Sequence, residues 1–262
     1  MPPGYAPRFL DTPIPPPDPG PRIAGDLVDL DGSPVIDYTH FSLAQSRSRR
    51  LARWVAWNVD GARLRELDRS GLRFRYDERL DRSVQTGDEA YRDNRLDRGH
   101  IARRADLCWG DPEEARAANA DSFYFTNITP QMDDFNQASR DGVWGRLENA
   151  LLSQVEVDRL AISVFGGPVL SDADPMHRGV AVPVEHWKII CYAVDGTLRA
   201  RAFLFAQQVE PVLKLDGFAA WQVEIGVIAE RTELIFPDML GAAPTARPQP
   251  PRPLSSTAEI DW

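Results

Sequence analysis

Two runs of apolar and β-branched residues, 186–194 and 198–206, flank the dipeptide Asp195-Gly196. Asp-Gly suits the positive backbone angles of a two-residue turn, so this arrangement predicts a long antiparallel hairpin. Further strands are expected over residues 52–59, 123–128 and 161–165, the last ending at the Gly166-Gly167-Pro168 break. Tight turns and long hairpins favour a sheet whose pairing is mainly antiparallel.

Helical patterns lie between these strands. Asp111 followed by Pro112 is typical of a helix start, because an N-cap carboxylate accepts from free backbone N–H groups and proline suits the first turn. Apolar residues at helical spacing predict a second helix over 143–155, and a third is expected over about 218–230. The chain is therefore predicted to adopt an α+β fold with a mixed, mostly antiparallel central sheet flanked by helices.

Proline-rich segments flank this central pattern. Residues 1–22 contain nine prolines and are expected to be extended and to lie on the surface. Residues 241–262 form a second proline-rich tail, for which a disordered end and a docking strap both stay open. The folded domain is expected over 23–240, which is long enough to bury a sizeable core.

Composition limits the classes of function. A formal net charge of −9 excludes a whole-surface attraction to nucleic acid, although it leaves a local basic groove open. The two cysteines, Cys108 and Cys191, provide neither a disulfide framework nor a cysteine-based zinc site. No apolar run approaches the roughly 18 residues of a membrane span. The start shows no cationic segment followed by an apolar one, so a cytoplasmic location without membrane contact is expected.

Residues suited to catalysis are concentrated between positions 91 and 148. Asp97-Arg98-Gly99-His100 comes first, Asn127 follows, and Asn136 and Glu148 come last. A neutral histidine can take a proton from water near pH 7. One asparagine carbonyl, together with phosphate oxygens and water, can hold a hard cation such as Mg²⁺. An arginine beside the histidine can relieve charge on a phosphoryl group, so the pattern favours phosphodiester hydrolysis.

These motifs resemble those of the DNA/RNA non-specific endonuclease family, which carries a ββα-metal finger and includes mitochondrial endonuclease G. The resemblance rests on three ordered stretches: Asp97-Arg98-Gly99-His100, Asn127-Ile128-Thr129-Pro130-Gln131, and Asn136-Gln137 followed by Trp144-Gly145-Arg146-Leu147-Glu148. It extends more weakly over about 35–240. Asp-Arg-Gly-His alone would be a weak signal, whereas three ordered motifs at compatible spacing are a specific one.

The resemblance implies a role for each motif residue. His100 would be the general base that deprotonates the attacking water, and Asn136 would be the direct protein ligand of Mg²⁺ or of Mn²⁺ as a substitute. Glu148 would hold metal-bound waters, and Arg98 would contact the scissile phosphate. Asn127 would position His100 or its loop. Asp97 and Gly99 are expected to shape the turn, since glycine allows positive φ and close backbone approach.

Arginines cluster around these motifs. Arg95, Arg98 and Arg103 favour a groove that follows phosphates, and the alternative is a surface network of ion pairs. The family also uses a phosphate-binding arginine upstream. Arg69, Arg73 and Arg75 are all candidates, and Arg73 is included among the expected nucleic-acid contacts.

The chain departs from the family pattern in two places. Asn136 and Glu148 lie 12 residues apart, against about eight in the family. On one unbroken helix that separation spans roughly 18 Å, which is too far for one metal shell, so the intervening chain is expected to loop out. After His100 the family often has a small residue and proline, whereas Ala102-Arg103 stands here.

The resemblance thus implies a metal-dependent endonuclease that cleaves DNA, with RNA open as a further substrate, and leaves 5′-phosphate ends. The alternative is a catalytically silent nucleic-acid-binding or scaffold module with the same fold. A zinc hydrolase lacks a suitable set of His and Cys ligands. Homodimerisation is common in the family and stays open. Because a non-specific nuclease endangers its own cell, an inhibitor or activating partner is also expected.

Overall fold

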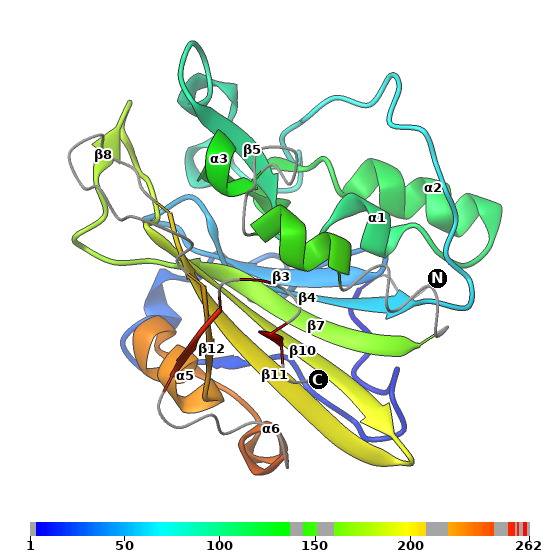
Figure 1. Ribbon diagram of the computed structural model, residues 1–262. Coiled ribbons are helices and arrows are strands. Elements are labelled where there is room, and N and C mark those ends of the chain that lie inside the picture. Colours follow the sequence, from blue (N-terminus) through cyan, green and yellow to red (C-terminus); the bar gives the residue numbers. More distant parts are fainter. Residues whose placement is uncertain are drawn as a thin grey trace.

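The computed structural model of the chain describes residues 4–136, 144–150, 160–207, 220–243, 251–254, 256 and 259–260. Within them, the main sheet has eight strands in the order β14-β12-β11-β10-β7-β4-β3-β2, and each neighbouring pair is antiparallel. Helices α1, α2 and α3 lie over one face, and α5 and α6 lie against the other (Figure 1). The predicted α+β class is confirmed, with antiparallel pairing where a mixed sheet was expected.

The strands of the main sheet are β2 (Ile36–Tyr38), β3 (Phe41–Gln45), β4 (Ala52–Asp60), β7 (Ala161–Val169), β10 (Glu185–Val194), β11 (Thr197–Ala206), β12 (Ala220–Val223) and β14 (Arg252–Pro253). Three small antiparallel pairs join β1 (Asp18–Pro19) to β13 (Leu234–Ile235), β5 (Leu96–His100) to β6 (Ile128–Met132), and β8 (Met176–His177) to β9 (Val180–Ala181). The helices are α1 (Arg104–Leu107), α2 (Pro112–Asp121), α3 (Asp133–Asn136), α5 (Ile225–Thr232), α6 (Asp238–Ala242) and a helical segment over 144–150. Short 3₁₀ turns cover Ala24–Asp26, Arg82–Val84, Asp88–Ala90 and Phe125–Asn127.

Strand β4 is apolar over most of its length because the sheet is covered on both faces at this position. Alternate side chains of a strand point to opposite faces of the sheet. Val55 and Trp57 belong to the core under α1 and α2, whereas Trp54 and Ala56 belong to the core on the opposite face. Because both faces are covered, both sets of positions are mainly apolar.

The predicted hairpin is confirmed. β10 and β11 pair from Glu185 opposite Ala206 to Val194 opposite Thr197, and the turn residues Asp195 and Gly196 both have positive φ, 51° and 72°. Two successive positive φ values are what a turn matched to the strand twist requires. The local sequence therefore determines this register.

Helix α2 also begins where expected. Its first residue is Pro112, and Asp111 and Glu114 form a reciprocal capping box, in which each side chain accepts from the other residue's backbone N–H. The helix expected over 143–155 is present over 144–150, and residues 151–155 lie outside the described part of the chain.

Two expectations about secondary structure are wrong in detail. The strand expected over 123–128 is instead a loop and the 3₁₀ turn Phe125–Asn127, followed by β6. Phe123 and Phe125 are buried, and Tyr124 forms only an isolated bridge with Arg75, so the segment is buried without pairing as a strand. Local β-propensity does not distinguish these two cases. The helix expected over about 218–230 is divided into β12 and α5.

The expected break at Gly166-Gly167-Pro168 lies inside β7. Gly166 is needed there because an added Cβ would lie 3.3 Å from the Trp57 ring and 3.2 Å from the backbone of Trp187. Pro168 is tolerated because pairing with β4 has already ended at Gly166, so its missing N–H interrupts no bond on that side.

The proline-rich beginning of the chain packs against the sheet. Tyr5, Leu10 and Ile14 are buried, and they belong to the core that contains Trp54 and Phe165. Many residues of the segment, Asp11 among them, are exposed as expected, while its few apolar side chains pack on the face that α5 and α6 leave open. At the other end of the chain, β14 pairs with β12 and Leu254 is buried. In the described part of the tail, residues 252–254 therefore lie against the sheet.

Truncating Ile14 tests the packing of this beginning. Ile14 is fully buried, so Ile14→Ala is expected to lower the free energy of unfolding by about 3 kcal/mol through lost burial and a residual cavity. Urea denaturation measures the change. Asp11→Ala in the same segment is the matched control, because Asp11 is exposed and should change stability by less than about 0.5 kcal/mol. Equal, small effects of both variants would show that the segment does not pack.

Among the described residues, no helix is long and apolar enough to cross a membrane.

Candidate active site

A small ββα unit holds the motif residues. β5 carries Asp97 to His100, β6 pairs with it antiparallel, and α3 follows β6 directly and ends at Asn136. The 27 residues between the strands, 101–127, form α1, α2 and a 3₁₀ turn. Among the described strands, β5 and β6 pair only with each other, and the side chain of Gln207 lies along β6, donating to the Pro130 carbonyl at 3.1 Å. Pro130 therefore costs no ladder hydrogen bond to a third strand.

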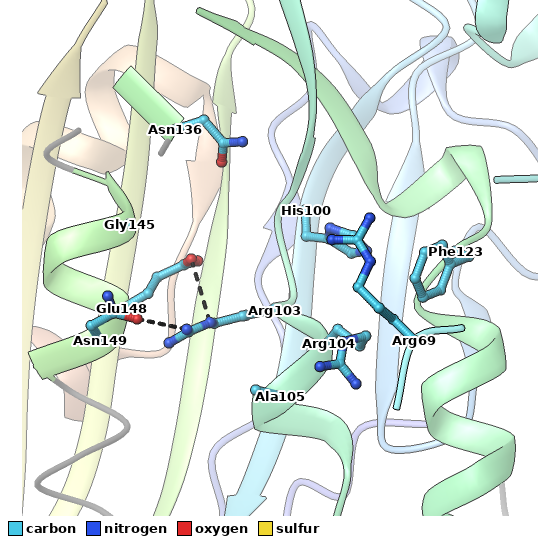
Figure 2. A pocket seen from close by; sticks show the side chains of 10 residues that line it. All are labelled: Arg69, His100, Arg103, Arg104, Ala105, Phe123, Asn136, Gly145, Glu148 and Asn149. Atoms are coloured by element: carbon cyan, nitrogen blue, oxygen red, sulfur yellow. Dashed lines mark hydrogen bonds and ion pairs between the residues drawn. The ribbon is translucent and has the colours of Figure 1, made fainter. Parts of the chain in front are cut away.

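His100, Asn136 and Glu148 line one pocket of about 280 Å³ (Figure 2). Arg69, Arg103 and Arg104 also line it, together with Phe123, Ala105, Gly145 and Asn149. Because a water occupies about 30 Å³ in the liquid, the pocket has room for a phosphate group and several waters. The 12-residue separation of Asn136 and Glu148 therefore does not keep them in different sites.

His100 stands at the end of β5 against an aromatic wall. Its ring centroid lies 5.6 Å from that of Phe74 and 5.4 Å from that of Phe123, which it meets edge-on. Within the described residues, Nε2 is buried and has no hydrogen-bond partner. Burial, and after it the positive charges of Arg104, Arg69 and Arg103, lower the pKa of His100 to about 3. The imidazole is therefore neutral at physiological pH, the form that can accept a proton.

Asn136 is oriented by the strand beside it. Its Nδ2 donates to Asp97 Oδ2 at 3.2 Å. An ionised carboxylate only accepts hydrogen bonds, so this contact fixes the amide nitrogen toward Asp97. The carbonyl oxygen points into the pocket (Figure 2).

Gly99 was expected to shape a turn, but it lies within β5 and has no positive φ. A Cβ at this position would collide with the side chain of Gln131 on β6. Close approach of the two strands, rather than backbone freedom, explains this glycine.

Glu148 lies on the helical segment 144–150 and is 7% exposed. Its Oε1 accepts from Lys188 Nζ at 2.8 Å, and its Oε2 lies 4.0 Å from Arg103 Nε. Lys188 is fully buried, with its ammonium 4.1 Å from the Trp144 ring and 5.3 Å from the Trp57 ring. The Lys188 ammonium thus provides a charged hydrogen-bond partner for this buried carboxyl group.

Asn127 fixes the chain that follows His100. Its Oδ1 accepts from the Ala102 N–H at 2.9 Å, and its Nδ2 donates to the carbonyl groups of Ala102 and Ser122. The Ile101 N–H also donates to the Asn127 carbonyl at 3.0 Å. Asn127 is fully buried and acts on the loop rather than within the pocket.

The arginines predicted to bind nucleic acid are divided among several environments. Arg103 lines the pocket. Arg98 is not among the lining residues; its guanidinium lies 5.5 Å from the ring of Phe74, which contacts His100, and it donates to Asp88 at 2.6 Å. Arg95 is paired with Asp133 and Asp134 at 2.6 and 2.9 Å. Arg73 is exposed and is not among the lining residues.

Some residues that line the pocket, and the buried Lys188 that pairs with Glu148 behind it, were not singled out from the sequence. Arg69 was one of three upstream candidates, and only the tertiary structure distinguishes it, by placing it in the pocket. Lys188 had a usable signal, because a lysine inside an otherwise apolar strand needs a buried acidic partner. Asn149 had no distinguishing signal.

The comparisons with known proteins identify the family and the fold. The model of the DNA/RNA non-specific endonuclease family matches residues 24–243. The chain belongs to this family. A solved structure, the crystal structure of the EndoG/EndoGI complex, matches 80% of the chain and 89% of its counterpart with a TM-score of 0.64 and 21% identity, which supports the fold.

Three relatives show the range of similarity. An uncharacterized protein of Sinorhizobium fredii, y4fB, is 34% identical over 98% of this chain and 42% of its own length. The mitochondrial nuclease EXOG of Danio rerio is 33% identical over 76% of the chain and 59% of its own length. Human mitochondrial endonuclease G is 28% identical over 74% and 66%. The chain thus spans about half the length of several curated relatives that it matches.

Proposed function

We propose that the chain hydrolyses phosphodiester bonds of DNA, and of RNA as a further substrate, as a metal-dependent, sequence-non-specific endonuclease. The observation that carries the proposal is that His100, Asn136 and Glu148 line one pocket together with three arginines. Membership of the family and the names of the relatives, nuclease and endonuclease G, support it.

The pocket residues fit a hard divalent cation. The Asn136 carbonyl is turned into the pocket by the contact with Asp97, and Glu148 supplies a carboxylate nearby. Within the described chain, no group of three His, Cys, Asp or Glu side chains gathers to hold a metal. A single amide ligand suits Mg²⁺, which keeps several waters, better than it suits zinc.

In this proposal, Asn136 is the direct protein ligand of Mg²⁺, with Mn²⁺ as a substitute, and Glu148 accepts hydrogen bonds from metal-bound waters. The bound cation would polarise the phosphoryl oxygen and stabilise the leaving 3′ oxygen, so that 5′-phosphate ends result. His100 takes the proton of the attacking water at a ring nitrogen. Asn127 holds the loop after His100 and so keeps the imidazole in place.

In this proposal the pocket arginines bind the substrate phosphate, and phosphate binding in turn changes the basicity of His100. Arg69, Arg103 and Arg104 face the pocket, and Arg98 lies beside Phe74. Burial contributes most to the lowered pKa of His100, and the positive charges of Arg104, Arg69 and Arg103 lower it further. A bound phosphodiester would offset this second contribution. Binding of substrate would therefore increase the basicity of His100 when a proton must be removed. Contacts to backbone phosphates also account for low sequence specificity.

We also propose that a partner protein inhibits this nuclease activity in the cell. A non-specific nuclease endangers the cell that makes it, and the fold matches that of EndoG solved in complex with EndoGI. Because the beginning of the chain packs into the core, an inhibitor would more readily act at the pocket than through that segment.

Cleavage of supercoiled plasmid tests the proposed function. We expect conversion to open-circular and linear forms with Mg²⁺, loss of conversion in EDTA, recovery when Mg²⁺ is restored, and 5′-phosphate ends that a ligase can join. Single-stranded RNA is tested in parallel. Binding of DNA without cleavage under Mg²⁺, Mn²⁺ or Ca²⁺ would instead favour the catalytically silent module.

A further inference from the structure

Glu148 lies between two positive side chains that approach its two oxygens. Lys188 Nζ donates to Oε1 at 2.8 Å and is fully buried, so this oxygen is committed within the core. Oε2 faces the pocket side, where Arg103 Nε lies 4.0 Å away. A cation that reaches Glu148 from the pocket therefore meets Arg103 at the same oxygen.

Arg103 reaches across the pocket to this position. It directly precedes α1 on the side that carries His100, and its side chain extends to the helical segment that carries Glu148 and Asn149 (Figure 2). Its Nη2 donates to Asn149 Oδ1 at 2.6 Å. Its Nη1 is buried and has no hydrogen-bond partner in the described residues. The guanidinium thus keeps one donor for a ligand that enters the pocket.

We propose that Arg103 couples cation binding to nucleic-acid binding: it neutralises Glu148 in the free protein and exchanges that carboxylate for a substrate phosphate when a divalent cation binds. This inference rests on the proposed function and adds a regulation of the same site. The Arg103 guanidinium and the cation are both positive and approach the same oxygen of Glu148. The contact of Arg103 with Glu148 therefore weakens cation binding, and a bound cation weakens that contact. A phosphate that accepts from Arg103 removes the competition, and nucleic acid should therefore raise the affinity for the cation.

Arg104 provides a matched comparison for this role. It lines the same pocket and carries the same charge. Its Nη1, however, donates to the Leu67 carbonyl at 2.8 Å and to Asn119 Oδ1 at 3.2 Å, on the side away from Glu148. Substituting Arg104 therefore lowers the general positive charge of the pocket without freeing Glu148.

Titration of Mn²⁺ into the full-length chain, followed by calorimetry, tests the competition. We expect Arg103→Met to bind Mn²⁺ roughly tenfold more tightly than wild type and Arg104→Met to change the affinity by less than about threefold. In a Glu148→Gln background, Arg103→Met should no longer tighten binding, since the shared carboxylate is gone. Circular dichroism and thermal unfolding confirm that each variant folds.

The coupling itself is measured in the His100→Ala background, which should bind DNA without cutting it. With a short duplex present, Mn²⁺ should bind roughly tenfold more tightly than without it, and Arg103→Met should remove most of this gain. If Mn²⁺ binds wild type but Arg103→Met leaves its affinity unchanged or weaker, this inference is wrong and the proposed nuclease is not affected. If no variant binds Mn²⁺ while plasmid is still cut with Mg²⁺, the coupling is also excluded. A chain that neither binds metal nor cleaves contradicts both.

Discussion

Replacing His100 by alanine is expected to lower kcat for DNA cleavage by about 10²–10⁴-fold, the usual contribution of a positioned general base. His100 is the pocket's only histidine among the lining residues described, and it stands opposite Asn136 and Glu148. The variant lacks the imidazole but keeps the arginines that bind the phosphate. Affinity for DNA, measured by fluorescence anisotropy in EDTA, should therefore stay within about threefold of wild type.

His177→Ala is the matched control for this loss. His177 lies on β8, where its Nε2 contacts Asn94 Nδ2 at 3.0 Å, and it does not line the pocket. Its replacement should leave the cleavage rate within about twofold of wild type. Equal activity of His100→Ala and wild type would remove His100 from the reaction.

The pH dependence of wild type adds a second measure of the same residue. Burial and the neighbouring arginines lower the pKa of His100 to about 3, so the neutral base persists as the pH falls below the ordinary histidine pKa of about 6.5. At saturating Mg²⁺, the acid limb of kcat/KM, which reports the free enzyme, should therefore lie clearly below 6.5. An acid limb at 6.5 would show that burial and the arginines together do not lower the pKa of His100 in the working enzyme.

Replacing Asn136 by alanine is expected to have the second largest effect. If Asn136 is the direct protein ligand of the cation, its loss should raise the half-saturating Mg²⁺ concentration and lower the cleavage rate by about 100-fold or more, since even groups that only support ligands contribute 10–100-fold. Cleavage rates measured over a wide range of Mg²⁺ concentrations separate the two effects. Part of the rate should return at high Mg²⁺, because Glu148 and the phosphate remain.

Asn149→Ala is the comparison in the same pocket. Asn149 accepts from Arg103, so its carboxamide is already engaged, and its loss should not raise the Mg²⁺ requirement.

Asp97→Asn tests how Asn136 is oriented. An amide at 97 no longer fixes which end of the Asn136 amide faces the pocket, so an intermediate rise in the Mg²⁺ requirement is expected. An unchanged Mg²⁺ dependence of Asn136→Ala would exclude Asn136 as the ligand.

Local signals were sufficient for parts of the fold. The β10–β11 hairpin follows from Asp195-Gly196, and the start of α2 follows from Asp111 and Pro112, because both depend on residues adjacent in the chain. The strand expected over 123–128 failed for the opposite reason. Its apolar residues are buried by partners distant in sequence, and burial alone does not impose strand pairing.

The sequence by itself determined the family, the hairpin and the set of side chains from which the pocket is built, since motif spacing and turn chemistry are local properties. Only the tertiary structure decided which arginine among Arg69, Arg73 and Arg75 lines the pocket, that Glu148 pairs with Lys188, and that Arg103 stands between His100 and Glu148. These contacts join residues separated by tens of positions, and they form because the sheet and its covering helices bring those positions together. Their charges interact through space, so no spacing along the chain specifies them.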